Sequence, residues 1–424
     1  MKRQNIDRRA FLKTGAGVVA ASAIAARLPA QTLKQLEGCE VSVPYRPITK
    51  GPKFHWFGYY DKLEFDPTNR FVLGMEVDFE HRSPSPTDEI RVGMVDLEDH
   101  DRWIELGRTT AWCWQQGCML QWRPGDKQEV VWNDREKDRY VCRILDVASG
   151  TVRTIPHPIY ALSPEGRWAV TTDFRRINDM RPGYGYAGIP DPYADDLAPE
   201  RSGIWRVDLE SGEAELILSL AEVAAVPCAI DTTGAKHYFN HLLVAPDGKR
   251  FVFLHRFRRS GDRTFTTRMM TAALDGSDLR VIDPSGATSH FIWRDPQHIL
   301  AWTRHDIAGN AFYLFEDSPT PKVEVVGRGV MTRNGHCTYL PGNEWILNDT
   351  YPDRDRYQEV YLYHVSSGRK VVLGRFHSPP AYTGEWRCDT HPRASRDGKR
   401  VVIDSPHGGR GRQLHLLDIG AIVG

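Results

Sequence analysis

The stretches Leu162-Ser-Pro-Glu-Gly-Arg-Trp-Ala-Val170 and Val244-Ala-Pro-Asp-Gly-Lys-Arg-Phe-Val252 share one pattern, in which a turn of Pro, an acidic residue and Gly joins two short apolar segments. Turns of this composition between apolar segments are typical of β-hairpins. Five further copies have turns centred on Pro67, Pro124, Pro296, Pro341 and Arg396. The last copy therefore carries arginine where the others carry proline.

Each copy is followed by a second signal of the form seen in Val95-Asp-Leu and Leu417-Asp-Ile, which indicates a third strand, and most have a short fourth segment such as Val323-Glu-Val-Val. Four strands repeating at about 40–50 residues are the signature of a β-propeller. The seven copies predict an all-β, seven-bladed β-propeller. Because the seventh copy shows only three strands, we expect residues 40–45 to supply its fourth strand and close the ring. The alternative is a two-domain β-sandwich protein.

Composition narrows the class of protein. The 424 residues include 55 Lys and Arg against 55 Asp and Glu, and 41% are apolar. This apolar content excludes disorder as the main state, and the zero net charge argues against wholesale nucleic-acid binding. The seven cysteines are an odd number, so at least one thiol is expected to be unpaired or metal-bound.

Residues 1–30 have the form of an export signal. They combine a basic start, an apolar centre and the small-residue exit Leu28-Pro-Ala30, and Arg8-Arg9 followed by Phe11-Leu-Lys13 resembles a twin-arginine signal. The apolar run 14–26 is too short to span about 30 Å of hydrocarbon. We therefore expect the mature protein, residues 31–424, to be one propeller domain in the periplasm or the medium, without stable membrane insertion.

Channel-facing positions can be counted from the turns. The first strand of each propeller blade lines the central channel, so residues five to eight before each turn should lie near one mouth of it. Those positions hold Asp61, Gln116, His157, His241, His290, His336 and His391. Four histidines in four successive blades are expected to face one another across the axis.

These histidines suggest a metal site. Three imidazoles and one thiolate satisfy tetrahedral zinc, and the predicted ligands are His290, His336, Cys388 and His391, with His241 left for chemistry. The alternative is a metal-free plug of hydrogen-bonded histidines. Cys337 should point to the opposite face of its strand from His336 and is a poorer candidate.

Cationic and aromatic residues follow the second strands, whose loops return to the same mouth. They include Arg135, Arg256, Arg304 and Tyr351. Such a ring on a neutral protein suits an anionic ligand, because arginine binds carboxylates with two parallel hydrogen bonds and aromatic rings stack on sugars. The only large irregular stretch, roughly 174–202, carries further arginines and tyrosines and is expected to be a binding loop.

The repeat, the channel histidines and the stretch Cys388-Asp-Thr-His-Pro-Arg393 together resemble the propeller-type polysaccharide lyases, which are the oligogalacturonate lyases and ulvan lyases. The resemblance covers the mature chain and is most specific in the last four blades. Oligogalacturonate lyases carry a Gln-x-x-His-Pro-His metal motif, of which this chain keeps His391 but has Cys388 and Arg393 at the outer positions. That departure argues against a catalytic manganese site and favours the structural zinc of the ulvan-lyase-like branch.

The resemblance implies β-elimination on a uronic-acid-containing, possibly sulfated, polysaccharide. Such a reaction needs a group that neutralises the uronate carboxylate, a base for the proton at C5 and an acid for O4. The implied neutralisers are Arg176 and Arg181, and the implied base is His241. The candidates for the acid, or for both proton transfers, are Tyr160, Tyr184 and Tyr186, and His81 and Gln116 are candidates to support the carboxylate.

Two other functions stay open from the sequence. A propeller can be a non-catalytic platform that binds glycans or proteins, since fold does not settle function. A glycoside hydrolase would need two carboxylates across the scissile bond, for which Asp61, Asp134 and Asp349 are candidates.

Overall fold

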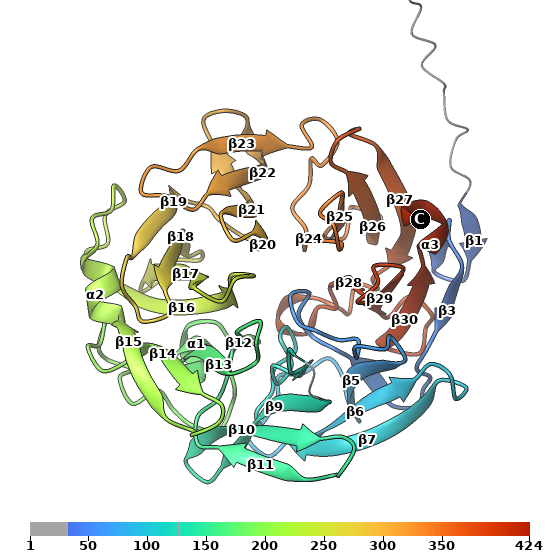
Figure 1. The fold of residues 1–424 in the computed structure, drawn as a ribbon, viewed down its shortest axis with the longest axis horizontal. Coiled ribbons are helices and arrows are strands. Elements are labelled where there is room, and N and C mark those ends of the chain that lie inside the picture. Colours follow the sequence, from blue (N-terminus) through green and yellow to red (C-terminus); the bar gives the residue numbers. More distant parts are fainter. Residues whose placement is uncertain (1–32, 126–127) are drawn as a thin grey trace, which may run out of the picture. The chain divides into compact units, whose positions relative to one another are not determined.

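Seven antiparallel sheets form a ring around a central channel (Figure 1). The structure is a computed structural model that describes residues 33–125 and 128–424, so the predicted export signal lies outside the described residues. The seven-bladed β-propeller expected from the repeats is confirmed.

The blades follow one another along the chain, each with its first strand innermost. The strands of blades 1 to 3 are β4 (Phe54–Trp56), β5 (Phe71–Val77), β6 (Ile90–Asp96), β7 (Arg102–Thr109); β8 (Gln121–Trp122), β9 (Glu129–Glu136), β10 (Arg139–Asp146), β11 (Val152–Ile155); and β12 (Ala161–Leu162), β13 (Trp168–Thr172), β14 (Gly203–Asp208), β15 (Ala214–Ser219). Those of blades 4 and 5 are β16 (Ala235–Val244), β17 (Arg250–Arg259), β18 (Thr266–Ala273), β19 (Arg280–Gly286); and β20 (Phe291–Asp295), β21 (His298–His305), β22 (Gly309–Glu316), β23 (Val323–Val326). Blade 6 has β24 (Thr338–Tyr339), β25 (Trp345–Asp349), β26 (Tyr357–His364) and β27 (Lys370–His377), and blade 7 has β28 (Arg393–Ala394), β29 (Arg400–Ser405) and β30 (Gln413–Asp418).

The N-terminal segment closes the ring, as the sequence predicted, but it contributes to two blades. β3 (Tyr45–Pro47) pairs with β30 and supplies the missing strand of blade 7. β2 (Cys39–Val41) pairs instead with β27 and, with β1 (Lys34–Leu36), extends blade 6 to six strands. The predicted range 40–45 therefore spans the crossing between the blades, where the carbonyl of Pro44 already accepts the N–H of Asp418.

Blade 1 departs from the repeat and fills the channel. Its inner strand β4 ends at Trp56, and the chain rejoins the sheet at Phe65, which bridges to Val72. We call the intervening residues 57–64 the plug. Gly58 permits the entry turn, because its φ is +114° and a Cβ there would meet the carbonyl carbon of Gln116 at 2.9 Å.

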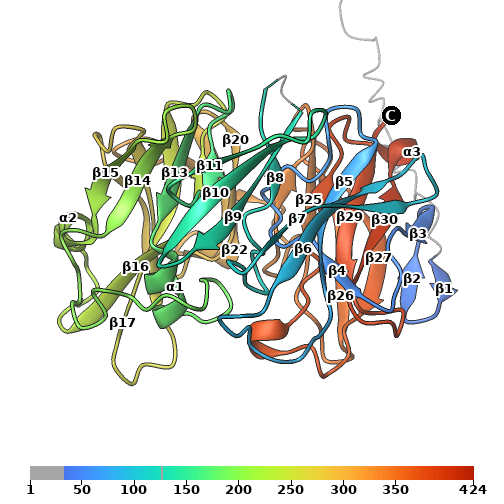
Figure 2. The same ribbon diagram turned by 90° about the horizontal axis from the view of Figure 1, so that it is seen from below.

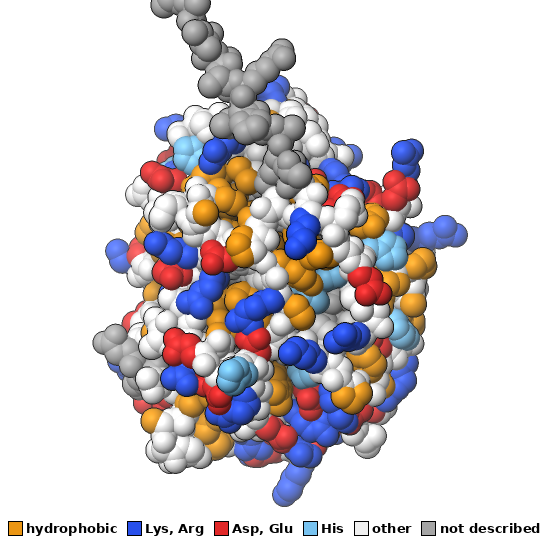
Figure 3. Space-filling view, turned by 90° about the vertical axis from the view of Figure 1, so that its right-hand side faces the viewer, with side chains coloured by type: hydrophobic (Ala, Val, Ile, Leu, Met, Phe, Trp, Pro, Cys, Tyr) orange, Lys and Arg blue, Asp and Glu red, His pale blue; other side chains and the backbone are white. Residues whose placement is uncertain are grey.

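The two ends of the channel differ. Figure 2 shows helix α1 (Phe174–Met180) and the loop after β17 on the same side of the ring, which we call the loop face. The opposite side carries the proline turns and is called the turn face. Figure 3 shows one flank, where acidic and basic side chains are interspersed, as expected for a chain with no net charge.

Helices are few and short. Besides α1 there are α2 (Leu220–Ala225), α3 (Gly420–Val423) and the 3₁₀ turn η1 (Gly384–Trp386). In residues 33–125 and 128–424 no helix is long and apolar enough to cross a membrane. All seven cysteines are free thiols, and Cys337 packs in the core between blades 5 and 6, as predicted.

Ring closure yields a first prediction. The Tyr45 hydroxyl on β3 lies 2.6 Å from Nε2 of His407 and 2.7 Å from Nδ1 of His415, both on buried parts of blade 7. Tyr45→Phe leaves both imidazoles without this partner and should lower the free energy of unfolding by about 1–3 kcal/mol in denaturant titrations. Tyr357→Phe is the control, since no described residue is hydrogen-bonded to the Tyr357 hydroxyl. Equal stabilities would show that this contact does not secure the closing strand.

Candidate active site

The four channel histidines do face one another. The ring centroids of His290 and His336 are 4.2 Å apart, and those of His336 and His391 are also 4.2 Å apart. His241 lies 6.3 Å from His290. This geometry confirms that the repeat registers were counted correctly in blades 4 to 7. His241 and His391 have left-handed backbones, with φ of 58° and 38°, a strain that often accompanies functional sites.

The plug brings two tyrosines into the middle of this cluster. The Tyr59 ring centroid is 4.9 Å from that of His241 and 5.1 Å from that of His391. Tyr60 contacts the same cluster, at 5.4 Å from His336. Both tyrosines lie within the counted window, eight and seven residues before Pro67, but the prediction took only Asp61 from that window and so missed them.

Hydrogen bonds assign the tautomer of His241. Tyr60 donates its hydroxyl proton to the carbonyl of Phe291 (2.8 Å) and accepts the Phe291 N–H (3.1 Å). Its oxygen can therefore only accept from Nε2 of His241, 3.1 Å away. The proton of His241 lies on Nε2, and the lone pair of Nδ1 faces the Tyr59 hydroxyl at 3.5 Å. Burial, reinforced by Arg256 and Lys62, lowers the pKa of His241 well below its usual value, so the ring is neutral.

A group suited to a divalent cation lies at one side of the cluster. The ligand atoms of His336, Asp389 and His391 lie within 4.8 Å of one another, and all three side chains are buried. Asp349 holds Nδ1 of His336 at 2.9 Å, which turns Nε2 of His336 toward the group, and Asp349 also accepts the N–H of His391. Both Nε2 atoms are buried without a hydrogen-bond partner. A carboxylate behind a ligating imidazole is the usual arrangement around a protein-bound metal.

The predicted zinc ligand set needs correction at Cys388. Its thiol is not among the mutually close ligand atoms of the group, and burial raises its pKa. His290 was also predicted as a ligand and lies next to the group, but it is not part of it. Both of its ring nitrogens already have neighbours: Nδ1 is 3.0 Å from Oδ1 of Asn334, and Nε2 is 3.4 Å from the Tyr351 hydroxyl.

A cavity of about 180 Å³ opens from the histidine cluster toward the loop face. We call it the front cavity. Four residues that the sequence analysis proposed lie in its wall: Arg181, Tyr184, Arg256 and Tyr351. His290, Tyr59 and Phe265 complete this part of the wall. Arg181 begins the coil after α1, and its guanidinium lies 3.6 Å from the Tyr184 ring centroid.

Arg256 is the strongest anion-binding group in this wall. It is 4% exposed, and its Nε and Nη1 have no hydrogen-bond partner. Burial and the neighbouring Arg181 lower the pKa of its guanidinium. A buried charge without a partner is costly, and an anionic ligand in the cavity would offset it.

The tyrosines of the front cavity have opposite acidities. Burial works to raise the pKa of Tyr184, but the charges of Arg181 and Arg387 bring it below its ordinary value. Arg387 also donates to the Tyr184 oxygen at 2.6 Å. Burial raises the pKa values of Tyr59 and Tyr351. Environments that push the pKa values of neighbouring groups apart identify candidate base and acid.

Two predicted catalytic residues are structural instead. Arg176 is fully buried and donates to the carbonyl of His237, to Asp191 and to three further carbonyls of its own loop, so no donor is left for a substrate. Tyr186 stacks on Phe174 at 4.2 Å and accepts from Asn133 at 2.9 Å, away from the cavity. Both side chains fix the 174–202 insertion rather than face a ligand.

Other predicted residues lie at or beyond the edge of the site. Tyr160 and Gln116 are on the channel axis, where Tyr160 donates to Gln116 at 2.8 Å and accepts the N–H of His241, but neither lines the front cavity. His81 and Arg304 are exposed, and Arg135 bonds the carbonyls of Pro86 and Ala187; none of the three lines the front cavity. His157 lies in a separate side cavity of blades 2 and 3, so Tyr160 occupies the axial position of blade 3.

Comparison with known proteins supports the architecture. No family model and no curated protein matches the chain. An oligogalacturonate lyase solved in complex with manganese is similar over 92% of this chain and 96% of its own, with a TM-score of 0.64 and 13% identity. Oligogalacturonate lyase from Vibrio parahaemolyticus matches over 91% and 97%, with a TM-score of 0.61 and 14% identity. The β-propeller domain of the trilobed protease from Pyrococcus furiosus reaches 0.50 at 11% identity, covering 87% and 94%. At these identities the likeness shows the fold.

The metal group yields a second prediction. Protein purified without chelators should contain a divalent cation, measured by elemental analysis, and His336→Ala or His391→Ala should remove it and lower the melting temperature, since metal binding stabilises the folded state. Cys388→Ser is the matched control and should retain the metal. Loss of metal from Cys388→Ser alone would restore the thiol to the ligand set.

Proposed function

We propose that the chain is a polysaccharide lyase that cleaves a uronic-acid-containing chain by β-elimination at the front cavity. The observation that carries this proposal is the wall of that cavity, where the unpartnered guanidinium of Arg256 lies near Tyr184, a phenol whose pKa is lowered by two arginines. The likeness in fold to oligogalacturonate lyases supports it.

The reaction follows from these groups. Arg256, assisted by Arg181, binds the uronate carboxylate and offsets its charge, so that the proton at C5 becomes acidic. The Tyr184 phenolate takes that proton, a double bond forms between C4 and C5, and the bond from C4 to O4 breaks. Tyr59 or Tyr351, kept protonated by burial, donates its proton to the departing O4.

The predicted base His241 takes a supporting role. The His241 ring packs against the rings of Tyr59 and Tyr60. The residue does not line the front cavity. Its Nδ1 faces the Tyr59 hydroxyl, so it orients this candidate acid.

A metal fits beside these residues. His336, Asp389 and His391 would hold a divalent cation, for which zinc is a suitable choice, and the cation would supply positive charge at the inner end of the cavity. Arg387 joins the two parts of the site, because it bonds both Asp389 (2.7 Å) and Tyr184.

The hydrolase alternative is weakened by the carboxylates. Asp349 supports His336, Asp134 pairs with Arg143, and Asp61 pairs with Lys62. Among the described residues no Asp or Glu lines the front cavity, whereas glycoside hydrolysis usually needs two. We further propose export by the twin-arginine signal to the periplasm or medium, where large anionic glycans are met, and ulvan-like sulfated chains stay one predicted substrate.

Activity gives a third prediction. Mature protein incubated with oligogalacturonate, glucuronan or ulvan should produce the ultraviolet absorbance of an unsaturated uronate, and Tyr184→Phe should abolish it because the base is lost. Tyr186→Phe is the matched control and should retain activity, because Tyr186 packs away from the cavity. New reducing ends without absorbance would indicate a hydrolase, and binding without either product would indicate a glycan-binding platform.

The acidity of Tyr184 gives a fourth prediction. Arg181 lowers the pKa of Tyr184, so Arg181→Gln should raise that pKa. Since the phenolate is the active form, the rising, acidic limb of kcat against pH should move to higher pH. Arg304→Gln, which removes an exposed arginine that does not line the cavity, should leave the limb in place. An unmoved limb in Arg181→Gln would exclude Tyr184 as the base.

A further inference from the structure

A second cavity occupies the other end of the channel, on the turn face. Its volume is about 490 Å³, within the range of small-molecule sites, and its wall includes Asp61, Lys62, Gln121 and Arg396 with several turn prolines. We call it the rear cavity. An adjoining cavity of about 450 Å³ shares Asp61, Lys62, Leu63 and Arg396 with it.

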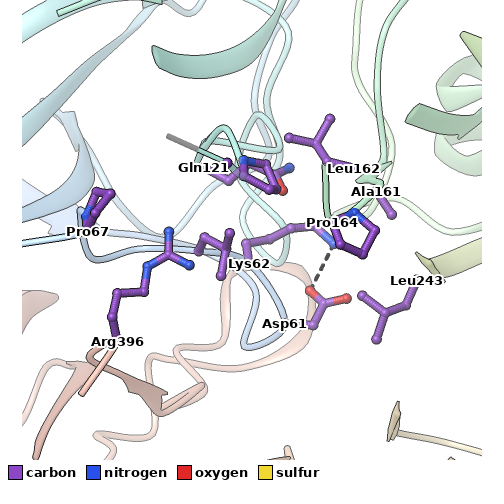
Figure 4. A pocket seen from close by; sticks show the side chains of 12 residues that line it. Asp61, Lys62, Pro67, Gln121, Ala161, Leu162, Pro164, Leu243 and Arg396 are labelled. Atoms are coloured by element: carbon purple, nitrogen blue, oxygen red, sulfur yellow. Dashed lines mark ion pairs between the residues drawn. The ribbon is translucent and has the colours of Figure 1, made fainter. Parts of the chain in front are cut away.

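Lys62 is a buried charge without a hydrogen-bond acceptor. Its side chain is 3% exposed and its ammonium makes no hydrogen bond with a described residue. The neighbouring carboxylate of Asp61 is 3.0 Å away, and Figure 4 shows this ion pair at the edge of the cavity. A lysine ammonium has three donors, so one carboxylate leaves it with bonds still to make.

Arg396 adds a second cation to the same space. It stands in the turn where the other six repeats carry proline. Its backbone N–H bonds Asn69 and its Nε bonds the carbonyl of Phe65, while its two terminal nitrogens have no acceptor among the described residues. Figure 4 shows the guanidinium pointing into the cavity from the side opposite Asp61.

The facing charges leave room for an anion. Asp61 is already paired with Lys62, and Asp66, the acid that lies near Arg396, is committed to the N–H groups of Thr68 and Phe71. Two cations with free donors thus face a cavity whose remaining wall is largely apolar and contains one amide side chain, Gln121.

We propose that the rear cavity is a binding site for a small oxyanion, such as the carboxylate of a sugar acid or inorganic phosphate, held between Lys62 and Arg396. The arginine would form a forked pair with the oxyanion, and the lysine would contribute a point charge. The site is separate from the front cavity, because the plug and the histidine cluster lie between the two.

The site also touches the catalytic plug. The other oxygen of Asp61 is 4.0 Å from Nε2 of His241. An anion that draws Lys62 away from Asp61 would leave the Asp61 carboxylate less neutralised beside the Nε2–H of His241, so the bound anion is placed to influence the residues behind Tyr59.

The test uses a protein in which anion binding at the front cavity has first been weakened by substitution. The substitution Arg256→Gln removes the arginine that would bind a carboxylate in the front cavity. In the mature protein with this substitution, we expect isothermal titration calorimetry to detect binding of galacturonate or phosphate. Adding Arg396→Gln should weaken this binding at least tenfold, because one of two cations is lost. Lys62→Met is a second variant with the same expectation, and thermal unfolding confirms that each variant is folded.

The outcomes are distinct. Binding of either probe that is lost in Arg396→Gln supports the site, and the probe that binds more tightly identifies the source of the oxyanion. Absence of binding by both probes, or binding that neither substitution weakens, overturns it. Because the measurement is made without front-site binding or turnover, its result does not depend on whether the chain is a lyase.

Discussion

The arrangement of the site depends on a buried ion-pair network between Arg393, Glu64 and Asp404. Arg393 donates two hydrogen bonds of 3.0 Å to Glu64 at the exit of the plug and one of 2.8 Å to Asp404. Asp404 in turn accepts the N–H groups of Phe57 and Gly58 at the entry. Removing one member of such a network leaves a buried charge unpaired and costs about 3–5 kcal/mol. Both ends of the plug are thereby fixed, so Tyr59 and Tyr60 are held rigidly among the histidines.

This role also explains how the chain departs from the lyase metal motif. In the resembled motif a histidine stands where this chain has Arg393. Here that position faces blade 1 and binds the plug instead of a metal. The candidate metal-binding group keeps His391 of that motif and includes Asp389 from the same segment and His336 from blade 6. Burial raises the pKa of Glu64 to about 7, and the charge and hydrogen bonds of Arg393 oppose this shift.

The sequence predicted what is periodic in this protein and missed what is not. Turns at regular intervals gave the seven blades, the closing strand and the four channel histidines, because equivalent positions in a repeat occupy equivalent places around the axis. In blade 1 the counted window held Tyr59 and Tyr60 as well as Asp61, but only Asp61 was chosen from it, so Tyr59 was not found. Arg176 and Tyr186 were misassigned because composition does not reveal that a loop uses its own arginine to bind its carbonyls. Cys388 was misassigned because the spacing of residues does not show how the chain turns before β28, where His391 has a left-handed backbone.

In the proposed reaction, the front cavity would couple substrate binding to the strength of the base. Arg181 lowers the pKa of Tyr184 in the free protein, which favours the phenolate. A uronate carboxylate at Arg181 and Arg256 would offset part of that positive charge. The phenolate would then become more basic at the moment when the C5 proton is presented and has been made acidic by the same arginines. The arginines thus favour the phenolate before binding, and a carboxylate bound to them would increase the driving force for proton abstraction by the phenolate.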